Sequence, residues 1–410
     1  MTAGQGVALG VRLERWMGMV RDAGFDGWLV ADFRWNNPLL PRLLGLSSGI
    51  LTRRCFLWLP ASGRGGPRVL ASQVDGHTLA HLDCPVTLYG GFDEMEARLR
   101  EMLHRGGRVA MEYVERGLLP TVSRVDAGLV ELVRGTGVTV VSSGALVANL
   151  EVWDERQKAL HEKAARGVDE ARRLALARCE EMLRRGERVT EGALAALINS
   201  YFAENGLVAG DGPDVAVDAH AADPHYGTGG GEGAVIMPGS VLLIDLWAKV
   251  RDVEDAPYAD STWMAYTGPT PPDDYMSAFT AVRAARDAAI ELIESAARAG
   301  RSVAGREIDR AARDSVARAG LAEHLVHRTG HSLGTDHVHG MGTNLDDVEF
   351  PDDRPLLTGS GFTVEPGLYW PGRFGVRLEV SAMLLPEGPR VTTERQEEIS
   401  VMQVSGQGKT

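Results

Sequence analysis

The chain has few cysteines and no long apolar run. Its 410 residues include only Cys55, Cys84 and Cys179, and no pair of them has the Cys-x-x-Cys spacing. The sequence therefore offers neither a disulfide framework nor a cysteine-rich zinc site, and we expect reduced, mostly buried thiols. Strand-like apolar runs such as 138–141 are far too short to cross a bilayer.

An excess of basic charge is also lacking. Lys and Arg number 43 against 56 Asp and Glu, which gives a formal net charge of −13. Nucleic acid is therefore not expected as a partner, because phosphate binding needs a basic face. Residues 1–6 are not a basic segment followed by an apolar stretch, so we expect no secretory signal, no membrane partner and a cytoplasmic protein.

Two common catalytic motifs are missing as well. The sequence contains no His-Glu-x-x-His, which excludes a zincin-like site. The glycines at 229–231 are not followed by Lys-Ser or Lys-Thr, so they predict a flexible loop and not a phosphate-binding loop.

The length and the pattern of the first part predict two domains. A chain of 410 residues exceeds the size at which a single core stops growing. Residues 11–150 alternate helical and strand patterns, which predicts a mixed α/β domain. The expected elements are a helix over 12–23, a strand over 27–31, a hairpin of 55–59 with 68–71, a helix over 92–104 capped by Asp93, and a strand over 108–111.

From Asp154 the pattern changes to two helices followed by strands, and this order occurs twice. Such a repeat predicts a duplicated α+β unit with a pseudo-twofold axis, divided in the Pro/Gly-rich segment 267–272. We expect domains at 1–153 and 154–403 and a flexible tail at 404–410. The expected helices are 155–185, 190–205 (with Thr190 as N-cap), 274–299 and 305–319, and the expected strands are 215–217, 241–246, 258–266, 362–364, 376–385 and 398–403.

One imidazole and four carboxylates stand out within this second part. Burying such a set together would be costly unless cations neutralised it, and an oxygen-rich set of five ligands suits a pair of divalent metals. The pattern therefore points to metal-assisted hydrolysis. The five residues are Asp245 in Leu-Leu-Ile-Asp-Leu, Asp260 in Tyr-Ala-Asp-Ser-Thr, His331 in Gly-His-Ser-Leu-Gly, Glu365 in Val-Glu-Pro-Gly and Glu379 in Val-Arg-Leu-Glu.

In this order and context, the five residues resemble the metallopeptidase family that includes Xaa-Pro aminopeptidase, prolidase and methionine aminopeptidase. The resemblance covers about 154–403 and implies an α+β fold with the "pita-bread" catalytic domain. The preceding region resembles the smaller α/β N-terminal domain of creatinase and prolidase. The resemblance also implies that Asp245 binds one metal, that His331 and Glu365 bind the second, and that Asp260 and Glu379 bridge both.

The same resemblance implies two divalent ions per subunit and a catalytic hydroxide. Bridging carboxylates hold two cations about 3.5–4 Å apart, and a water between them ionises near neutral pH. Carboxylate-rich ligation favours Mn²⁺, with Co²⁺ or Zn²⁺ as alternatives. Glu365 would also shuttle a proton from the water toward the leaving amine.

Further family positions are matched by His225, His339 and Arg377. The resemblance implies that His225 contacts the substrate backbone, that His339 stabilises the oxyanion, and that Arg377 anchors a carboxylate ligand from behind. Because 339 − 331 = 8 is one residue longer than usual, His337 competes with His339 for its role. His324 and His327 are expected to be surface or strand histidines.

Some positions depart from the family pattern. The two aspartates are 260 − 245 = 15 residues apart, where eleven is usual, and we expect a hairpin loop around 252–255 to absorb the excess. Trp263 stands where an arginine is frequent, and His220 stands where Asn or Ser is common. These changes leave the ligands in place and bear on substrate preference.

The resulting hypothesis is a dinuclear Xaa-Pro aminopeptidase that acts on short proline-containing peptides, as a homodimer whose N-terminal domain partly covers the partner's site. A prolidase is the first alternative, and it would need a cation for the substrate's free carboxylate, for which Arg354 and Arg373 are candidates. A metal-dependent C–N hydrolase of a small amide and a catalytically inactive binding module are the others.

Overall fold

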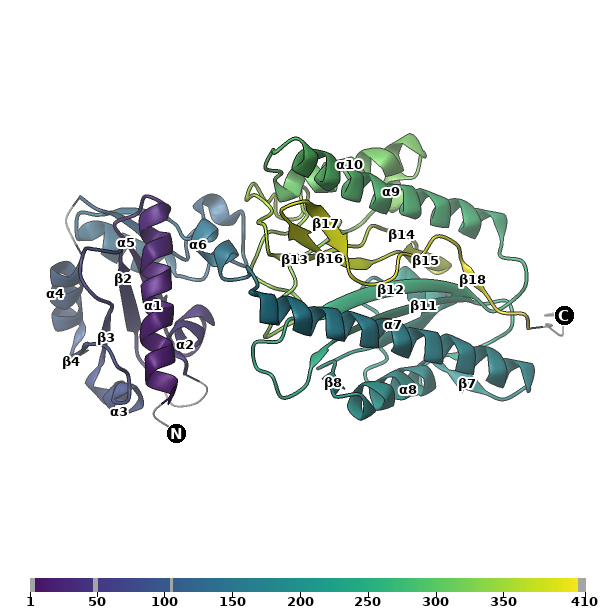
Figure 1. Cartoon of the computed structure of the whole chain (residues 1–410), viewed down its shortest axis with the longest axis horizontal. Coiled ribbons are helices and arrows are strands. Elements are labelled where there is room, and N and C mark those ends of the chain that lie inside the picture. Colours follow the sequence, from purple (N-terminus) through teal and green to yellow (C-terminus); the bar gives the residue numbers. More distant parts are fainter. Residues whose placement is uncertain (1–3, 47–50, 104–105, 405–410) are drawn as a thin grey trace. The chain divides into compact units, whose positions relative to one another are not determined.

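The computed structural model describes residues 4–46, 51–103 and 106–404, of which 4–12 are described by their backbone alone. The chain divides into two compact units, Met1–Val147 and Ala148–Thr410 (Figure 1). The boundary lies within α6 (Gly144–Asn149), whereas the sequence placed it at 153/154. Of the predicted tail at 404–410, residues 405–410 lie outside the described residues.

The N-terminal unit is built on a six-stranded mixed sheet in the order β4-β3-β2-β1-β5-β6. The predicted hairpin is confirmed, since β2 and β3 pair antiparallel. The strands are β1 (Gly27–Asp32), β2 (Cys55–Pro60), β3 (Arg68–Ser72), β4 (Val86–Tyr89), β5 (Arg108–Met111) and β6 (Thr139–Ser142). The helices are α1 (Gly4–Asp22), α2 (Leu39–Leu44), α3 (Gly76–Leu79), α4 (Phe92–Met102), α5 (Ala127–Gly135) and the short turns η1 (Gln73–Asp75) and η2 (Glu115–Gly117).

The prediction that Asp93 caps a helix is wrong. Helix α4 begins at Phe92 with Gly91 as its N-cap, and Asp93 lies inside the first turn. There its charge still favours the helix, because the first turn carries the positive end of the macrodipole. Glu94 in the same turn accepts a hydrogen bond from the amide of Gly90 (2.8 Å), which fixes the chain just before the N-cap.

The second unit contains two helix pairs, and each pair is followed by strands, as predicted. Helices α7 (Glu155–Arg184) and α8 (Glu191–Glu204) pack on β11 (Val241–Val250) and β9 (Asp214–Val217). Helices α9 (Asp273–Arg298) and α10 (Gly305–Arg318) pack on each other and cover the later strands (Figure 1). The remaining elements are β7 (Val189–Thr190), β8 (Leu207–Val208), β10 (Val235–Ile236), β12 (Ala259–Tyr266), β13 (Gly361–Val364), β14 (Gly367–Trp370), β15 (Phe374–Arg377), β16 (Val380–Leu385), β17 (Gly388–Val391), β18 (Ser400–Val401), η3 (Asp218–Ala222) and η4 (Ala322–His324).

Local sequence explains where the first two helices begin. Asp154 accepts a hydrogen bond from the amide of Gln157 (2.8 Å), and the Gln157 side chain accepts one from the amide of Asp154 (3.2 Å). This capping box starts α7. Thr190 starts α8 as predicted, because its hydroxyl accepts from the amide of Ala193 (3.2 Å).

The long hairpin of β11 and β12 brings the two aspartates to one face. In its register Asp245 lies opposite Thr262, and Trp247 lies opposite Asp260. Residues two apart on a strand share a face, so Asp245 and Asp260 are diagonal neighbours. The extra residues between them form the connection at 251–258, where the sequence predicted a loop.

The prediction of one strand over 376–385 is wrong. Two strands, β15 and β16, occupy this segment, and the chain changes sheets between them at Leu378 and Glu379. The first pairs with β14, whereas the second pairs with β13 and β17. The break brings two side chains together, because Arg377 at its start and Glu379 within it both reach Thr262.

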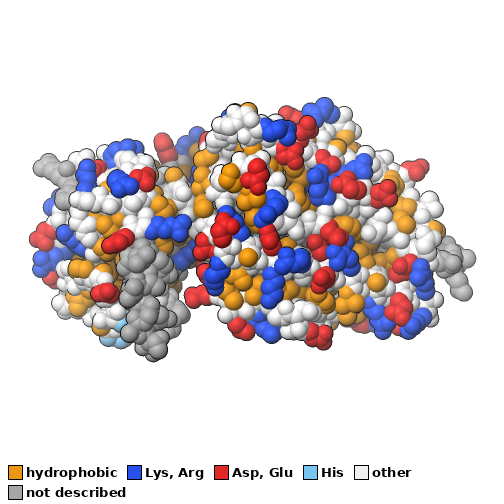
Figure 2. All heavy atoms as spheres, in the orientation of Figure 1, with side chains coloured by type: hydrophobic (Ala, Val, Ile, Leu, Met, Phe, Trp, Pro, Cys, Tyr) orange, Lys and Arg blue, Asp and Glu red, His pale blue; other side chains and the backbone are white. Residues whose placement is uncertain are grey.

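Charged side chains of both signs are intermingled on the face of α7 seen in Figure 2. Ion pairs three or four residues apart, such as Arg184 with Glu180 and Arg178 with Glu181, account for this pattern. Within the described ranges, no helix has both the length and the apolar character needed to cross a membrane.

Helix α7 is tied to the strands by a fully buried histidine. His161 Nδ1 lies 2.8 Å from the carbonyl oxygen of Tyr258, and its Nε2 lies 2.7 Å from Thr392 Oγ1. Burial lowers the pKa of His161 from 6.5 to about 4. Folded protein therefore binds fewer protons than unfolded protein between these values, and stability is lost as the pH falls from 6.5 toward 4.

We predict that His161→Gln flattens this pH dependence. The free energy of unfolding of the wild-type protein should fall by up to about 3 kcal/mol more than that of the variant between pH 6.5 and pH 4. Urea unfolding at both pH values measures the difference. His81→Gln, at an exposed histidine of the other unit, is the control. Equal pH dependence in the wild type and His161→Gln would show that the buried imidazole does not carry the effect.

Candidate metal centre

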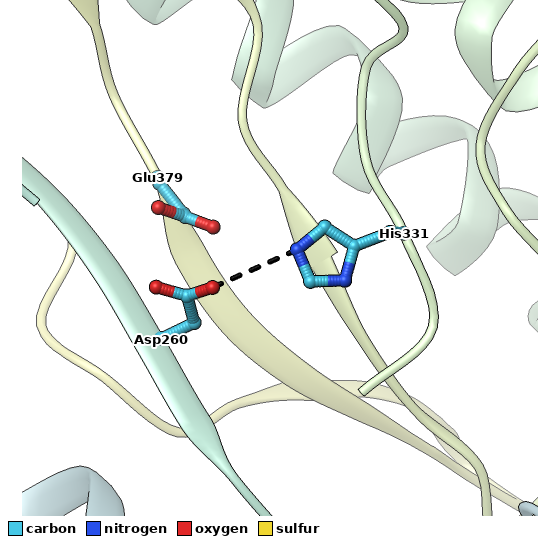
Figure 3. Close-up of side chains that lie close together, drawn as sticks. All are labelled: Asp260, His331 and Glu379. Atoms are coloured by element: carbon cyan, nitrogen blue, oxygen red, sulfur yellow. Dashed lines mark ion pairs between the residues drawn. The ribbon is translucent and has the colours of Figure 1, made fainter. Parts of the chain in front are cut away.

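Three of the predicted ligands form a compact buried cluster. The carboxylates of Asp260 and Glu379 face the imidazole of His331 (Figure 3), and one ligand atom from each lies within 4.8 Å of the others. His331 Nε2 is 3.6 Å from Asp260 Oδ2. The three side chains come from β12, from the segment after η4 and from the break after β15, so the fold assembles them from distant parts of the chain.

Glu365 joins this cluster beside His331. Its Oε1 lies 3.5 Å from His331 Nε2. Thr363 holds the two together, because its hydroxyl donates to Glu365 Oε1 (3.1 Å) and accepts from the His331 amide (3.0 Å). His331 Nδ1 lies 2.9 Å from the carbonyl oxygen of Ser332, which fixes the proton on Nδ1 and leaves Nε2 free as a ligand.

Asp245 is connected to the cluster through Thr262 and Arg377. The Thr262 hydroxyl lies 3.1 Å from Asp245 Oδ1 and 2.7 Å from Glu379 Oε2. Arg377 donates from Nε to Thr262 Oγ1 (3.0 Å) and forms an ion pair with Asp245. Arg377 thus lies behind the carboxylate of a predicted ligand, Asp245.

The ionisation of the aspartates and Glu379 reflects their burial and their crowding. Burial, and then the charges of Asp260 and Glu365, raise the pKa of Asp245 to about 7, although Arg377 opposes the shift. Burial and neighbouring carboxylates raise the pKa of Asp260 and that of Glu379 well above their ordinary values. Four carboxylates beside one guanidinium would carry a net charge of −3 in the interior if all were ionised.

Two buried oxygens of the cluster have no hydrogen-bond partner among the residues that the structure describes. They are Asp260 Oδ1 and Glu379 Oε1. A buried acceptor without a partner is costly, and most such atoms in proteins are satisfied by water or by an ion. Divalent cations would satisfy both oxygens and neutralise the carboxylates, so the five residues fit a metal site with mainly oxygen ligands.

Glu365 differs from the other carboxylates in its surroundings. Burial alone would raise the pKa of Glu365, but the charges of His331, His327 and Arg377 together lower it. Burial in turn lowers the pKa of His331. A lowered pKa favours the ionised carboxylate, which is the form that both metal binding and proton acceptance require.

Of the two competing histidines, His339 lies at the cluster. Its ring centroid is 4.1 Å from that of His331, with an interplanar angle of 51°. The charge of His331 and then burial lower the pKa of His339 to about 3. Both histidines are exposed, but among the described residues no ring contact or hydrogen bond of the His337 side chain is present, whereas the His339 ring contacts that of His331.

His225 lies on an exposed turn after η3, and this turn reaches Arg377 of the candidate metal centre. The carbonyl oxygen of the preceding residue, Pro224, accepts a hydrogen bond from Arg377 Nη1 (3.4 Å). Buried Glu191 holds this turn, since it accepts from Tyr226 Oη (2.6 Å) and lies 2.9 Å from His220 Nδ1. His220, a departure from the family pattern, therefore belongs to the support of the turn.

His327, expected at the surface or on a strand rather than as a ligand, lies half-buried in a loop and outside the three-residue cluster. Its Nε2 lies 2.8 Å from Tyr369 Oη, and that hydroxyl lies 3.3 Å from Arg377 Nη1. Thr262, Thr363 and Tyr369 are further residues of the site that the sequence reasoning missed. The strand pattern carried a signal for Thr262, because it is two residues from Asp260 and hence on the same face.

Comparison with known proteins gives concordant matches. The model of metallopeptidase family M24 matches residues 159–384. The probable dipeptidase PepE of Mycobacterium tuberculosis is 31% identical over 222 residues, which are 53% of this chain and 53% of the relative. The Xaa-Pro dipeptidase of Lactobacillus helveticus is 30% identical over 223 residues, 53% of this chain and 54% of the relative. The matched segment thus spans about half the length of these relatives.

The likeness of the whole structure extends further. The crystal structure of dipeptidase PepE from Mycobacterium ulcerans aligns with a TM-score of 0.74 and 25% identity, covering 97% of this chain and 99% of that chain. A prolidase from Thermococcus sibiricus aligns with a TM-score of 0.66 at 22% identity, covering 95% and 98%. The predicted α+β class with a pita-bread domain is confirmed by these neighbours.

We predict that Thr262→Val weakens metal binding without unfolding the protein. The variant removes the hydroxyl between Asp245 and Glu379, and loss of a group that orients metal ligands lowers affinity about 10–100-fold. Titration calorimetry with Mn²⁺ measures the change. Thr280→Val, at an exposed position of α9, is the matched control. Wild-type affinity in Thr262→Val would contradict the bridging role of the hydroxyl.

Proposed function

Because the chain belongs to metallopeptidase family M24, we propose that it is a metal-dependent peptidase that hydrolyses the Xaa-Pro bond of dipeptides. The observation that carries the hydrolytic part is the convergence of Asp260, His331, Glu365 and Glu379 at one buried place, with Asp245 joined to it through Thr262. Without bound cations, these buried charges would destabilise the protein, so the set supports a metal site.

The proposed ligands of two divalent ions are Asp245, Asp260, His331, Glu365 and Glu379. Bound there, the ions would act as Lewis acids that polarise the scissile carbonyl and lower the pKa of water. Four carboxylates against one imidazole favour Mn²⁺ over Co²⁺ or Zn²⁺. The oxygens of Asp260 and Glu379 that have no partner support a cation in contact with both side chains.

The chain's own groups supply the proton transfer and the positioning. Glu365 would accept a proton from the attacking water and deliver it to the leaving proline nitrogen. His339, beside His331, would donate a hydrogen bond to the developing oxyanion. His225, on its exposed turn, would contact the substrate backbone. Arg377 and Thr262 would keep the Asp245 carboxylate in place.

The choice between dipeptides and longer peptides depends on a cation for the free carboxylate of a dipeptide. The two arginines that the sequence analysis named as candidates, Arg354 and Arg373, are already paired with other groups of the chain. Arg354 is buried against Asp352 and the carbonyls of Met341 and Gly342, and exposed Arg373 pairs with Asp274.

Arg328 supplies the missing cation. It is half-buried, and its guanidinium forms no hydrogen bond or ion pair within the described part of the chain. Its charge is near enough to lower the pKa of Glu365 and that of His339. A guanidinium is suited to bidentate binding of a carboxylate. The names of the relatives, which include dipeptidases, support the same substrate class.

The aminopeptidase that the sequence analysis favoured is the alternative, and it is favoured again if Arg328 has no effect on dipeptides. Retention of all five ligands counts against an inactive binding module. The small-amide hydrolase becomes the better hypothesis if metal-loaded protein cleaves no Xaa-Pro bond. The homodimer and the cytoplasmic location stay predictions.

We predict that removal of metal by a chelator abolishes cleavage of Leu-Pro and that Mn²⁺ restores it. Asp260→Asn should lower kcat by more than about 100-fold while the unfolding temperature stays near that of the wild type, because the variant removes one ligand charge without changing side-chain volume. Release of proline measures the activity. Turnover by the metal-free protein, or turnover by Asp260→Asn at the wild-type rate, would contradict the metal-dependent assignment.

We predict that Arg328→Met raises KM for Leu-Pro about tenfold or more and leaves KM for Leu-Pro-amide unchanged. The amide lacks the carboxylate that Arg328 would bind, so it separates this interaction from a general disturbance. Arg373→Gln, at an exposed arginine paired with Asp274, is the control variant. An equal rise in KM for both substrates would assign Arg328 a structural role. The aminopeptidase would then be the better hypothesis.

A further inference from the structure

A fifth acidic residue, Asp214, faces the metal centre without belonging to it. Strand β9 pairs antiparallel with β11, and Asp214 lies directly opposite Asp245 in that register. Opposite residues have their Cβ atoms about 4.5–5.5 Å apart on the same face of the sheet. The three-residue cluster of Asp260, His331 and Glu379 does not include it.

The Asp214 carboxylate is half-buried and lacks a partner. It forms no hydrogen bond or ion pair with any residue that the structure describes. A Cβ atom added at Gly227 would lie 3.1 Å from Asp214 Oδ1, so the carboxylate lies against the turn that carries His225. Asp214 thus stands between the ligand Asp245 on one side and a proposed substrate contact on the other.

An aromatic ring borders the same place. Trp247 is two residues beyond Asp245 on β11 and therefore shares its face, and it is partly exposed. Its ring packs on the backbone of Gly212, two residues before Asp214, because a Cβ atom at Gly212 would lie 2.4 Å from a ring carbon. A carboxylate and an indole ring therefore lie side by side along β9 and β11.

An acidic group at this position needs an explanation. Asp214 lies beside the carboxylate-rich metal centre, where like charges destabilise one another. Arg377, the buried arginine beside Asp245, is engaged with Asp245 and Thr262. A carboxylate with an aromatic face next to it is a combination that binds ammonium and guanidinium groups. A cation held next to Asp245 would lie beside the proposed metal centre, where the first residue of a substrate would bind.

We propose that Asp214 and Trp247 form a subsite for a cationic nitrogen of the substrate's first residue. The nitrogen is either the N-terminal ammonium or the charged end of a Lys or Arg side chain, and both present the same chemistry. The proposal deepens the proposed dipeptidase function and rests on it. Together with Arg328, the subsite would give the site one anion and one cation for the two ends of a zwitterionic dipeptide.

Binding of small amides to the Mn²⁺-loaded full chain tests this subsite without relying on turnover. The probes are argininamide and norleucinamide, which share the α-ammonium group and differ in the charge of the side chain. The variant is Asp214→Asn, which removes the charge at constant volume. Asp211→Asn, at an exposed carboxylate three residues away, controls for long-range charge. Trp247→Leu tests the aromatic face separately.

We expect Asp214→Asn to weaken binding of argininamide about tenfold, which is the effect of losing one charge-assisted hydrogen bond. Weaker binding of both probes assigns the subsite to the ammonium, whereas weaker binding of argininamide alone assigns it to the side chain. Trp247→Leu should weaken the same probes by a smaller factor, and Asp211→Asn should change neither.

The subsite is overturned if Asp214→Asn binds both probes as the wild type does, or if neither probe binds the wild type. Failure of the proposed function has a different signature. In that case the probes bind with the expected dependence on Asp214, but metal-loaded protein releases no proline from Leu-Pro or Arg-Pro.

Discussion

Neutralisation of buried negative charge is the constraint on which the second unit depends. Asp245, Asp260, Glu365 and Glu379 lie in the interior, and Arg377 is the guanidinium bound among them. Without cations, protonation must remove most of the charge, and the raised pKa of Asp245, about 7, expresses that conflict. With cations, the same carboxylates can all be ionised, and the oxygens without partners gain ligand bonds.

The architecture meets this constraint with neutral hydroxyls and one rigid hairpin. Thr262 and Thr363 each connect two ligand residues, so the carboxylates are held in orientation before any cation is present. The β11–β12 pairing places Asp245 and Asp260 on one face. Ligands from the first half of the unit therefore meet ligands from the second half at fixed positions, which is the preorganisation that hydrolytic metal sites require.

The proposed substrate contacts are made by charged groups that are not among the proposed metal ligands. Asp214 and Arg328 are both half-buried and have no partner among the described residues. Their charges are therefore available to bind groups of a substrate. Opposite charges at two positions would favour a short substrate with both termini free over a long chain.

The sequence predicted more of the fold than of the site's surroundings. Helical periodicity and caps located α7 to α10, because these signals are local. The order and contexts of the five candidate ligands were visible as well. Pairing between strands was not, so the break after Arg377, the position of Asp214 opposite Asp245 and the bridging role of Thr262 required coordinates. Asp93 was misread as a cap because the N-cap is a glycine, Gly91, two residues earlier.

The metal content of the purified chain tests the central claim most directly. Protein loaded with Mn²⁺ and then dialysed should retain about two ions per chain, as four carboxylates and one imidazole require. Elemental analysis against protein concentration gives the ratio. A ratio below one ion per chain would contradict the account, because the buried carboxylates would then need another source of neutralisation.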